Sequence, residues 1–565
     1  MGKRILIVGG VAGGASAAAR ARRLDEAAEI IIFERGPHVS FSNCSLPYYL
    51  SGIVENSADL ILMSPEKFKK QFNIEARVNN EVIKIKRAEK KILVRDLETG
   101  EEYEESYDKL ILSPGARPIV PASIEGVEQK HVFTVRNVVD ISRIKDYLDF
   151  NKIEDIAVIG GGFIGVEVAE NLRLAGKNVT LIEALDQVMS PFDYDMAQIL
   201  HKEILDHGIN LILNDAVVKI NSASVELKSG KKVTARAVIM AIGVFPETDL
   251  AREAGLEIGE TGGIKVDRNY LTNDRDIYAI GDAIEVYHRL SRKKTRLALA
   301  GPAQRQARAA IDHIYNIPHR NNGVIGSSVV KVFDINAACT GLNEKTARDA
   351  GIPYDFVYII TGDKVGLMPD SNPMHFKLLF EYPTGRILGA QAIGKGNVDK
   401  RIDVIATMIL MDGSLEDLKE LELCYAPPFG TARDVVNQAA LVGLNLLHGR
   451  FKQVPVSKIR ELVENDAFIL DVREKGEYRT GHIKNAINIP LSELRDRLDE
   501  IPRDQPVYVH CRSAQRSYFA VMALQELGFE NVYNIAGSYL ALSYYEYYMD
   551  QYTGREKILT QYNFI

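Results

Sequence analysis

The sequence predicts an α/β protein with two doubly wound dinucleotide-binding domains, a further α+β domain and a C-terminal α/β domain. A short apolar strand, a glycine-rich turn and a helix occur twice, at residues 5–24 and again at 156–175. From about residue 326 alternating strands precede helices, and a compact strand–helix pattern follows residue 455. At 565 residues the chain is too long for one hydrophobic core, so several domains are expected.

The first repeat has the features of a βαβ nucleotide-binding unit. The apolar strand 5–8 leads into a turn of small residues and an alanine-rich helix, and a second strand, 30–33, ends in an acid. Backbone N–H groups at such a helix start favour a pyrophosphate, and the acid binds ribose hydroxyls. Val11 stands where the middle glycine of the pattern is expected. The expected cofactor contacts are Gly9, Gly10, Ala12, Gly13, Gly14, Glu34 and Arg35.

The second repeat matches the same pattern fully. Its strand 156–159 is followed by a turn and a helix, and the strand 179–182 again ends in an acid. A later strand closes on a small-residue turn at Gly243. The expected contacts are Gly160, Gly162, Gly165, Glu183 and Gly243. Two such units in one chain predict two nucleotide sites.

Composition and charge narrow the class of protein. Hydrophobic content of 46% and charged content of 26% are ordinary for a soluble globular protein, and the net charge of −7 argues against a nucleic-acid partner. No run approaches the about 18 apolar residues that span a membrane, and the apolar run at 5–8 is too short for a signal peptide. The four cysteines are far apart with no CxxC pair, so we expect no metal site, no disulfide scaffold and a cytoplasmic location.

The segment 276–282 makes the resemblance specific. With the two repeats it resembles the two-dinucleotide flavoprotein disulfide reductase family. That resemblance implies that the first unit binds FAD, with Asp282 on the ribityl chain and Ala300 as a further contact, and that the second, inserted unit binds NADH or NADPH. Glu183 favours NADH because a carboxylate would repel a 2′-phosphate, while Lys177 leaves NADPH open.

Cys44 lies just after the first unit, at the expected start of a helix. A helix N-terminus lowers the pKa of a thiol, although an isolated cysteine is more often buried and inert. Tyr49 stands where a CxxxxC pair would place its second cysteine, so Cys44 must exchange with an outside thiol, a sulfenic acid or a persulfide. The segment 40–44 resembles the single-cysteine branch: coenzyme A-disulfide reductases, NADH oxidases and peroxidases, and CoA-persulfide or polysulfide reductases.

Within that branch, the resemblance implies a coenzyme A site and a homodimer. The α+β domain resembles the family's dimer-forming domain, and Tyr425 would reach the flavin and Cys44 across a two-fold interface. No histidine occurs in 17–22, which disfavours a peroxidase. Leu367-Met368 replaces an expected tyrosine, a departure from simple CoA-disulfide reductases. The implied CoA contacts are Arg20, Arg23, Ser40, Asn43, Gln304 and, from the partner subunit, a residue equivalent to Arg433.

The C-terminal region resembles a rhodanese domain, on the segments 470–473, 481–483 and 486–490. Cys511 ends a strand and opens a loop with Arg512 and Arg516, which predicts an anion-binding cradle for a persulfide. Phosphatases with a similar loop carry the arginine six positions after the cysteine, where this chain has Ser517, so sulfur is favoured over phosphate. The tyrosine-rich tail beyond Tyr544 has no assignment.

The combined prediction is a flavoenzyme that uses NADH or NADPH to reduce CoA disulfide, CoA persulfide or polysulfide through a Cys44–CoA mixed disulfide, coupled to sulfane-sulfur handling at Cys511. One alternative is an NADH oxidase or peroxidase that cycles Cys44 through a sulfenic acid. The other is a redox sensor whose rhodanese domain docks partners. The expected domains are FAD-binding (1–149 and 267–325), NAD(P)H-binding (150–266), dimerisation (326–448) and rhodanese (452–548).

Overall fold

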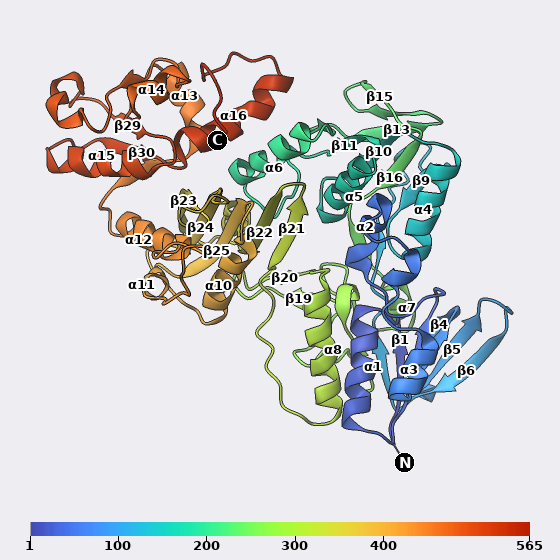
Figure 1. Ribbon diagram of the computed structural model, residues 1–565. Coiled ribbons are helices and arrows are strands. Elements are labelled where there is room, and N and C mark those ends of the chain that lie inside the picture. The colour runs from blue at the N-terminus through green and yellow to red at the C-terminus, as the bar shows by residue number, and fades with distance from the viewer. Residues whose placement is uncertain (1, 565) are drawn as a thin grey trace. The chain divides into compact units, whose positions relative to one another are not determined.

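A computed structural model of the chain describes residues 2–564, which form two compact units. The first unit runs to Leu185 and resumes from Ile212 to Val324. The second consists of Asp186–Leu211 and the described residues from Ile325 onward. The labels of helices and strands are those of Figure 1.

The first glycine-rich turn belongs to a five-stranded parallel sheet. Its strand order is β18 (Ile277–Ala279), β7 (Lys109–Leu112), β1 (Arg4–Val8), β2 (Glu29–Glu34) and β3 (Glu75–Val78). Parallel neighbours need a crossover connection, and α1 (Ala12–Leu24) supplies it between β1 and β2. Because β18 joins through β7, residues near 280 reach the same sheet edge as the turn that follows β1.

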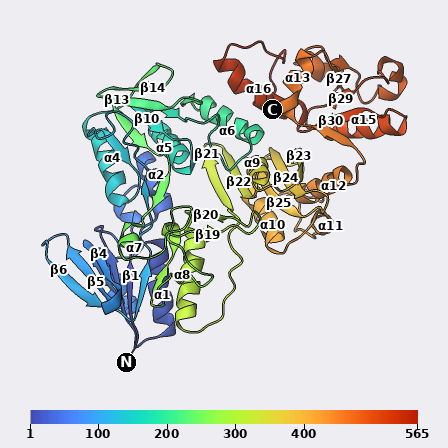
Figure 2. The ribbon, with the colours of Figure 1, turned by 180° about the vertical axis from the view of Figure 1, so that it is seen from behind.

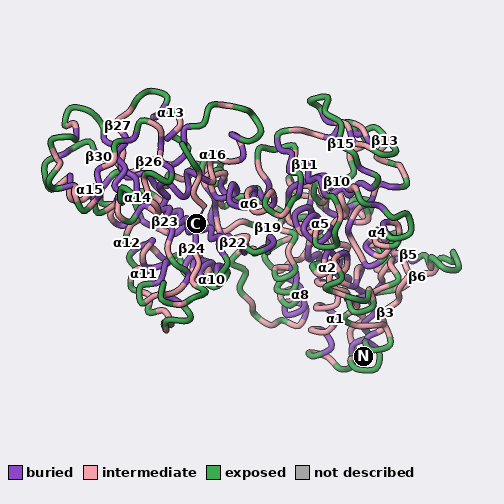
Figure 3. Tube along the Cα trace, turned by 45° about the horizontal axis from the view of Figure 1, so that its top comes forward, coloured by how far each residue is buried: buried purple, intermediate pink, exposed green. Residues whose placement is uncertain are grey.

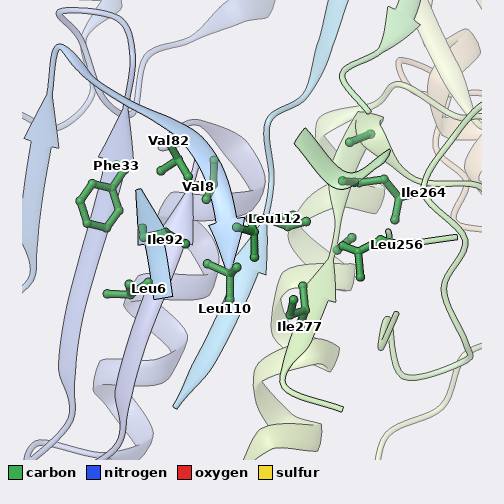
Figure 4. Close-up of a cluster of buried hydrophobic side chains, with 14 of the residues drawn as sticks. Leu6, Val8, Phe33, Val82, Ile92, Leu110, Leu112, Leu256, Ile264 and Ile277 are labelled. Carbon is green, nitrogen blue, oxygen red and sulfur yellow. The ribbon is translucent and has the colours of Figure 1, made fainter. Parts of the chain in front are cut away.

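The two faces of this sheet are covered differently. Successive side chains of a strand point to opposite faces, so Ile5 and Ile7 pack with α1 and α8 (Ala300–Ile314), which lie side by side in Figure 1. Leu6 and Val8 pack instead in the cluster drawn in Figure 4. That cluster includes side chains of an antiparallel sheet made of β4 (Asn80–Lys86), β5 (Lys91–Asp96) and β6 (Glu102–Ser106). The helix α3 (Pro65–Phe72) adds Phe68 to the α1 side.

The second glycine-rich turn lies on a similar parallel arrangement. β11 (Asn178–Ile182), β10 (Asp155–Ile159), β16 (Ala237–Met240) and β9 (Val132–Thr134) are neighbours in that order. Figure 3 shows buried chain along β10 and β11, as expected for strands covered on both faces. The helices of this region are α4 (Val138–Phe150) and α5 (Phe163–Leu174), and β12 (Asn210–Ile212) spans the division between the two units.

Short elements complete the first unit. They are η1 (Asn43–Ser45), α2 (Leu46–Ser51), η2 (Ser57–Leu60), η3 (Arg87–Glu89), β8 (Ala116–Pro118), β13 (Val217–Asn221), β14 (Ser224–Leu227), β15 (Lys232–Thr234), β17 (Val244–Pro246), α7 (Asp249–Glu253), η4 (Gly281–Ala283), β19 (Val286–Tyr287) and β20 (Lys294–Thr295). The helix α2, which begins two residues after Cys44, packs against α5.

The second unit contains an antiparallel sheet with helices packed on it. The strand order is β21 (Ser328–Val332), β22 (Ile335–Gly341), β25 (Ile387–Gly394), β24 (Pro373–Glu381) and β23 (Tyr354–Gly362). As Figure 2 shows, α10 (Val398–Leu410) packs on β22 and β25, and α12 (Val435–Leu447) packs on β23 and β24. The helix α12 begins at Val435, where the Asp434 carboxylate caps it by accepting a hydrogen bond from the Val436 N–H. The shorter helices are α9 (Glu344–Asp349) and α11 (Leu415–Lys419).

A buried lysine joins this sheet to α6 (Tyr194–Asp206) and its N-terminal cap. Lys377 on β24 is fully buried, and its Nζ lies 3.1 Å from Asp193, 2.9 Å from Asp195 and 2.5 Å from Glu344. Removing one partner from such a group leaves an uncompensated buried charge, which costs about 3–5 kcal/mol. The lysine therefore holds three segments distant in sequence together.

The C-terminal sheet is parallel, in the order β26 (Lys452–Val454), β30 (Val532–Ile535), β29 (Val507–His510), β27 (Phe468–Asp471) and β28 (Ile487–Asn488). Its helices are η5 (Val456–Lys458), α13 (Ile459–Glu464), α14 (Lys475–Arg479), η6 (Leu494–Asp496), η7 (Leu498–Glu500), α15 (Gln515–Glu526) and α16 (Ser538–Tyr552). The tyrosine-rich tail forms α16, which packs on α6 through ring contacts of Tyr545 with Tyr194 and of Tyr548 with His201. No helix among residues 2–564 has the length and apolar character required to cross a membrane.

Candidate nucleotide sites and two cysteine sites

The first glycine-rich turn is shaped so that side chains cannot be added to it. Gly9 has a φ of +90°, and a Cβ there would lie 2.1 Å from the Ser113 carbonyl oxygen. A Cβ on Gly14 would lie 1.8 Å from the Gly9 carbonyl oxygen. Helix α1 starts at Ala12, and no side chain caps its first N–H groups. Those N–H groups and the positive end of the helix form a site for a pyrophosphate.

A cavity of about 480 Å³ opens beside this turn. The Glu34 carboxylate at the end of β2 accepts hydrogen bonds from the Gly10 N–H at 2.9 Å and the Gly36 N–H at 3.0 Å, so it is held at the cavity wall. Arg35, also on the wall, forms an ion pair with Glu247 at 2.7 Å. A glycine cradle, a helix start and a carboxylate along one elongated cavity are the groups that a dinucleotide such as FAD needs.

Asp282 lies on the same cavity, in η4. Burial raises the pKa of its carboxyl to about 6. The preceding turn is fixed by Gln306 on α8, whose side-chain oxygen accepts a hydrogen bond from the Gly281 N–H at 2.7 Å. Sequence reasoning missed Gln306, and no local motif marks it. The predicted contacts Ala300 and Gln304 are exposed at the start of α8 and do not line the cavity, whereas Ala303 does.

The second turn repeats the first closely. Gly160 has a φ of +111°, and a Cβ there would lie 2.4 Å from the Ala241 carbonyl oxygen. Glu183 accepts hydrogen bonds from the N–H groups of Gly161 at 2.6 Å and Leu185 at 2.9 Å. Gly162, the N-cap of α5, is exposed and faces open space. This turn can therefore also accept a pyrophosphate.

The two other predicted residues of this region lie at opposite ends of its parallel sheet: Gly243 follows β16 on the side of the cradle, and Lys177 precedes β11 on the other side. Gly243 is exposed after β16, with a φ of +140°. Lys177, considered for a 2′-phosphate, forms an ion pair with Glu154 at 3.2 Å.

Cys44 lies in the three-residue helix η1 and is exposed. Partial burial of the thiol, followed by the negative charges of Glu167 and Asp282, raises its pKa. The predicted lowering by a helix start is therefore wrong for this polypeptide, since η1 is too short to offset the burial and two carboxylates. Its neighbour Asn43 is exposed and lines the cavity beside the first cradle, which places Cys44 at that cavity's edge.

Ser40 connects the Cys44 segment to the first cradle. It has a φ of +51°, its N–H donates to the Gly10 carbonyl at 2.9 Å, and its carbonyl accepts from the Leu62 N–H at 2.8 Å. Tyr49, at the position of the missing second cysteine, lies under Lys145, with Nζ 5.3 Å from the ring centroid.

The arginines of α1 differ in their surroundings. Arg20 bridges to α8 through Asp312, with its Nε 2.7 Å from the carboxylate. Arg22 is buried and donates to backbone carbonyls, including Phe72 at 2.8 Å and Asn73 at 2.8 Å, so its role is structural. Arg23 is exposed. Of these three, Arg23 is the one freely placed to meet a ligand phosphate.

Tyr425 and Arg433 belong to the second unit, in the segment that precedes α12. The Tyr425 side chain is 48% exposed and nearby Phe429 is 64% exposed. Arg433 is exposed as well, and Cys424 is an exposed free thiol. The single chain thus leaves this segment open.

Cys511 has opposite surroundings to Cys44. It is 1% exposed, at the end of β29. Its Sγ accepts a hydrogen bond from the Ser517 hydroxyl at 3.6 Å, and its N–H donates to the Ser538 hydroxyl at 3.2 Å. The Arg516 guanidinium donates two hydrogen bonds to Glu477, at 2.6 and 2.7 Å, and interacts with Cys511. A cysteine held by donors and a cation suits sulfur that carries negative charge.

Arg512, the other predicted arginine of this loop, faces the antiparallel sheet. Its charge, after burial, lowers the pKa of His375 on β24, to about 3. The Nδ1 atom of His375 and the Tyr358 hydroxyl form a hydrogen bond of 2.8 Å. The charge of Arg512 therefore acts on this sheet. Arg516 is the arginine of the loop that interacts with Cys511.

Among residues 2–564, two groups of side chains have ligand atoms close enough together for a metal ion, although the sequence predicts no metal site. One group is Glu203, His207 and Asp334, and the other is Asp193, Asp195 and Glu344. The Lys377 ammonium already fills the second group.

Comparisons with known proteins agree with this layout. Residues 3–307 match the family "Pyridine nucleotide-disulphide oxidoreductase", 327–435 match its dimerisation domain, and 456–543 match the rhodanese-like domain. A coenzyme A disulfide reductase of Staphylococcus haemolyticus is 34% identical over 438 residues, which cover 77% of this chain and 98% of that relative.

Solved structures extend the similarity to the C-terminal region. The reduced Bacillus anthracis CoADR-RHD is 46% identical, with a TM-score of 0.94 and coverage of 96% of this chain and 98% of that one. An NAD-dependent persulfide reductase from A. fulgidus is 36% identical, with a TM-score of 0.91 and coverage of 95% and 99%. A water-forming NADH oxidase from Lactobacillus brevis is 26% identical, with a TM-score of 0.76, and covers 79% of this chain and 99% of its own.

Proposed function

The chain belongs to the pyridine nucleotide-disulphide oxidoreductase family, and we propose that it reduces CoA disulfide, CoA persulfide or polysulfide through a Cys44–CoA mixed disulfide. It is a flavoprotein oxidoreductase with a C-terminal rhodanese domain, so the predicted enzyme class, fold class and cofactors FAD and NAD(P)H are confirmed. The substrate, the mixed disulfide and the coupling to Cys511 are the proposal.

One observation carries this proposal: an exposed, unpaired cysteine lies at the edge of the dinucleotide cavity. Asn43 lines that cavity and Asp282, on its wall, acts electrostatically on Cys44. A CxxxxC partner is missing, because Tyr49 occupies the fifth position after Cys44, and Cys44 forms no disulfide with another cysteine of the chain. A thiol in this place can form a disulfide only with a partner from outside the polypeptide.

The residues of the first cradle fit FAD. When bound, FAD would carry two electrons from the nicotinamide to the sulfur–sulfur bond. The α1 N-terminus would hold the pyrophosphate, Glu34 the ribose and Asp282 the ribityl hydroxyls. Ser40, bonded to Gly10, would keep Cys44 in register with this site.

Cys44 performs the exchange steps. Its sulfur attacks the sulfur bonded to CoA, a Cys44–S–S–CoA bond forms, and the bond to the outer sulfur breaks, which releases sulfide from a persulfide or CoA from CoA disulfide. Two electrons, which NADH would supply by way of FAD, and two protons then convert the mixed disulfide to the Cys44 thiol and the CoA thiol. Arg23 and Asn43 are exposed and suited to bind CoA; Arg20, being paired with Asp312, would have to share its charge.

Cys511 would carry sulfane sulfur as a persulfide. Its sulfur takes the outer sulfur from a donor such as thiosulfate, which leaves as sulfite, and passes it to the CoA thiolate, which becomes CoA persulfide. The hydroxyl of Ser517 and the Arg516 guanidinium are placed to stabilise the terminal sulfur anion. The product of one site is then the substrate of the other.

A homodimer is part of the proposal. The dimerisation-domain match at 327–435 and the exposed Tyr425 and Phe429 favour a partner subunit that covers this segment. Tyr425 and Arg433 would then contribute to the partner's Cys44 site. Light scattering on the holoenzyme should give the mass of a dimer, and Arg433→Ala should raise the KM for CoA substrates more than it lowers kcat.

NADH is the proposed nicotinamide donor. The carboxylate of Glu183 is fixed by two backbone N–H groups where a 2′-phosphate would come, and Lys177 is paired with Glu154.

We also propose the domain limits that the sequence predicts, and a cytoplasmic location. All four cysteines are free, which suits a reducing compartment.

The test is steady-state kinetics with CoA disulfide, CoA persulfide and polysulfide on the wild type, Cys44→Ser and Cys511→Ser. Loss of NADH-dependent reduction in Cys44→Ser supports the proposal, and full activity of that variant on all three substrates overturns it. Stoichiometric water formation from oxygen, indifferent to CoA substrates, would instead favour the NADH oxidase alternative. Negligible turnover with every substrate, together with partner capture by residues 452–548, would favour the redox sensor.

A further inference from the structure

A carboxyl side chain that no part of the proposed mechanism uses lies next to Cys44. Helices α2 and α5 pack together, and the Ser51 hydroxyl on α2 donates to the Asn171 side-chain oxygen on α5 at 2.7 Å. One turn earlier on each helix are Tyr48 and Glu167, and Cys44 lies in η1, two residues before α2 begins. Residues three or four apart share a helix face, so Tyr48 lies on the face of α2 that carries Ser51, and Glu167 lies on the face of α5 that carries Asn171.

Electrostatics agrees with this placement. Among the charges that act on the Cys44 thiol, Glu167 contributes most and Asp282 next. Burial, followed by the charges of Glu167, Glu170 and Cys44, raises the pKa of Tyr48. The Glu167 side chain is partly buried in the seam, and its carboxylate forms no ion pair with a cation of the described residues.

The surroundings of Glu167 bring the pKa of its carboxyl close to neutral pH. Burial and then the neighbouring Glu170 raise the pKa of Glu167 to about 7. Of the other elements packed here, η1 brings Cys44, α2 brings Tyr48, and η4 brings Asp282, whose pKa burial raises to about 6. From α4, the Lys145 ammonium lies over the ring of Tyr49.

We propose that Glu167 is the acid–base group of the Cys44 site, which takes the proton from the Cys44 thiol as it attacks and gives it to the leaving sulfur. The inference deepens the proposed function and rests on it. Written in full, Cys44–SH and R–S–S–R′ give Cys44–S–S–R and R′–SH. One S–S bond breaks and one forms, the proton passes through the Glu167 carboxylate, and no electrons are gained or lost overall.

Physical chemistry explains why the site needs such a group. The raised pKa of Cys44 keeps its thiol protonated near neutral pH, whereas the thiolate is the nucleophile. A base whose pKa lies near the working pH transfers protons most effectively, and positioned acid–base groups contribute about 10²–10⁴-fold to rates. Glu167 both raises the thiol pKa and provides the base that removes the proton.

The experiment compares Glu167→Gln, Glu167→Asp and the control Glu26→Gln, an exposed carboxyl of the same unit, as FAD-loaded full-length enzymes. Alkylation of Cys44 by iodoacetamide is measured against pH after NADH reduction, with mass spectrometry of the Cys44 peptide because Cys424 is also exposed. In Glu167→Gln the alkylation midpoint should move to lower pH, while kcat at pH 7 should fall by about 100-fold. Glu167→Asp should recover part of the rate, and Glu26→Gln should match the wild type in both measurements.

Alkylation and rate profiles of Glu167→Gln that overlay the wild type would overturn the inference, as would a change confined to the KM for NADH. If Glu167→Gln loses its flavin, the pH profiles of the wild type and of Glu167→Asp test the inference instead. A wild-type kcat/KM without an ionisation between pH 6 and 8, or a Glu167→Asp profile identical in shape and height to the wild type, would also overturn it. Full activity of Cys44→Ser would instead refute the proposed function itself, so the two failures are distinguishable.

Discussion

The two cysteines of the proposed function, Cys44 and Cys511, lie in opposite environments. Cys44 is exposed, and the nearest charges that act on it are the carboxylates of Glu167 and Asp282. Cys511 is 1% exposed, its sulfur accepts a hydrogen bond from the Ser517 hydroxyl, and it interacts with the Arg516 guanidinium. The difference suits two kinds of sulfur chemistry. A thiol that must form and release a mixed disulfide gains from an accessible surface and a nearby base, whereas a stored persulfide anion gains from enclosure and positive charge.

The largest effect should come from removing the Cys44 sulfur. Cys44→Ser should lower NADH-dependent reduction of CoA disulfide by about 1000-fold or more, because a hydroxyl cannot form the mixed disulfide. Sulfur transfer from thiosulfate to cyanide at Cys511 should persist in the same variant. Cys424→Ser, which removes the other exposed thiol, is the control and should behave as the wild type. Equal loss of both activities in Cys44→Ser would show that the two sites are not separable.

Next in size is the loss of the cation at Cys511. Arg516→Met should lower the thiosulfate sulfurtransferase rate by about 100-fold, because no charge then offsets the persulfide anion. Arg516→Lys should fall between the two, since a lysine cannot reproduce the two-pronged contact with Glu477. The measurement is sulfite release from thiosulfate under steady-state conditions. An Arg516→Met rate within twofold of the wild type would show that the Arg516 charge does not stabilise the persulfide anion.

A smaller effect is expected from the hydroxyl that donates to Cys511. Ser517→Ala deletes the donor 3.6 Å from Sγ, and one neutral hydrogen bond contributes about 1 kcal/mol, so sulfurtransferase activity should fall about fivefold. The serines near Cys44 bond to each other instead, Ser42 to Ser45 at 2.8 Å. Ser45→Ala should therefore leave the iodoacetamide reactivity of Cys44 close to that of the wild type.

The smallest effect should be on local stability as the pH changes. The region around Cys44 and the region around His201 and His375 should respond in opposite directions. The raised pKa values of Glu167, about 7, and Asp282, about 6, mean that the folded state holds protons more tightly than the unfolded state, so lowering the pH through this range stabilises the Cys44 region. The lowered pKa values of His201 and His375, both about 3, mean that the unfolded state holds protons more tightly. That contribution to stability is present above pH 6.5 and is lost as the pH falls below it.

From pH 8 to pH 7 the Glu167 shift amounts to about 0.3 kcal/mol by linkage, each histidine shift to about 0.1 kcal/mol, and the Asp282 shift to less than either. Hydrogen exchange followed by mass spectrometry, corrected for intrinsic rates, should show slower opening of α2 and α5 and faster opening of α6 and β24 at the lower pH. His375→Asn should reduce the change at β24 only. Opening rates that shift in the same direction in both regions would contradict the assignment of these charges.

Short-range pattern was enough to predict both nucleotide cradles. The glycines at 9, 14, 160 and 165 are required because backbone atoms approach within 1.8–2.4 Å of where a Cβ would be, and such crowding comes from the local strand–turn–helix path. The family, the enzyme class and the rhodanese domain also followed from motifs close together in sequence. The individual site residues remain predictions, although Glu34, Asp282 and Asn43 do line one cavity.

Contacts between distant segments decided the rest. The Cys44 pKa depends on Glu167 and Asp282, which are more than 100 residues away, so the helix-start argument gave the wrong direction. Arg20 is paired with Asp312 because α1 and α8 pack side by side, which no first-helix motif reveals. In the same way the tyrosine-rich tail became interpretable only as α16 packed on α6.

The sequence alone therefore determined which groups the chain carries: two glycine-rich cradles, a cysteine without a CxxxxC partner, and a rhodanese-like domain with a cysteine followed by two arginines. These depend on residue type and on backbone geometry over a few positions. Only the tertiary structure decided how each cysteine is tuned, exposed between carboxylates for Cys44 and enclosed among donors for Cys511. The physical reason is that burial and Coulomb interactions act through space, between groups that folding brings together.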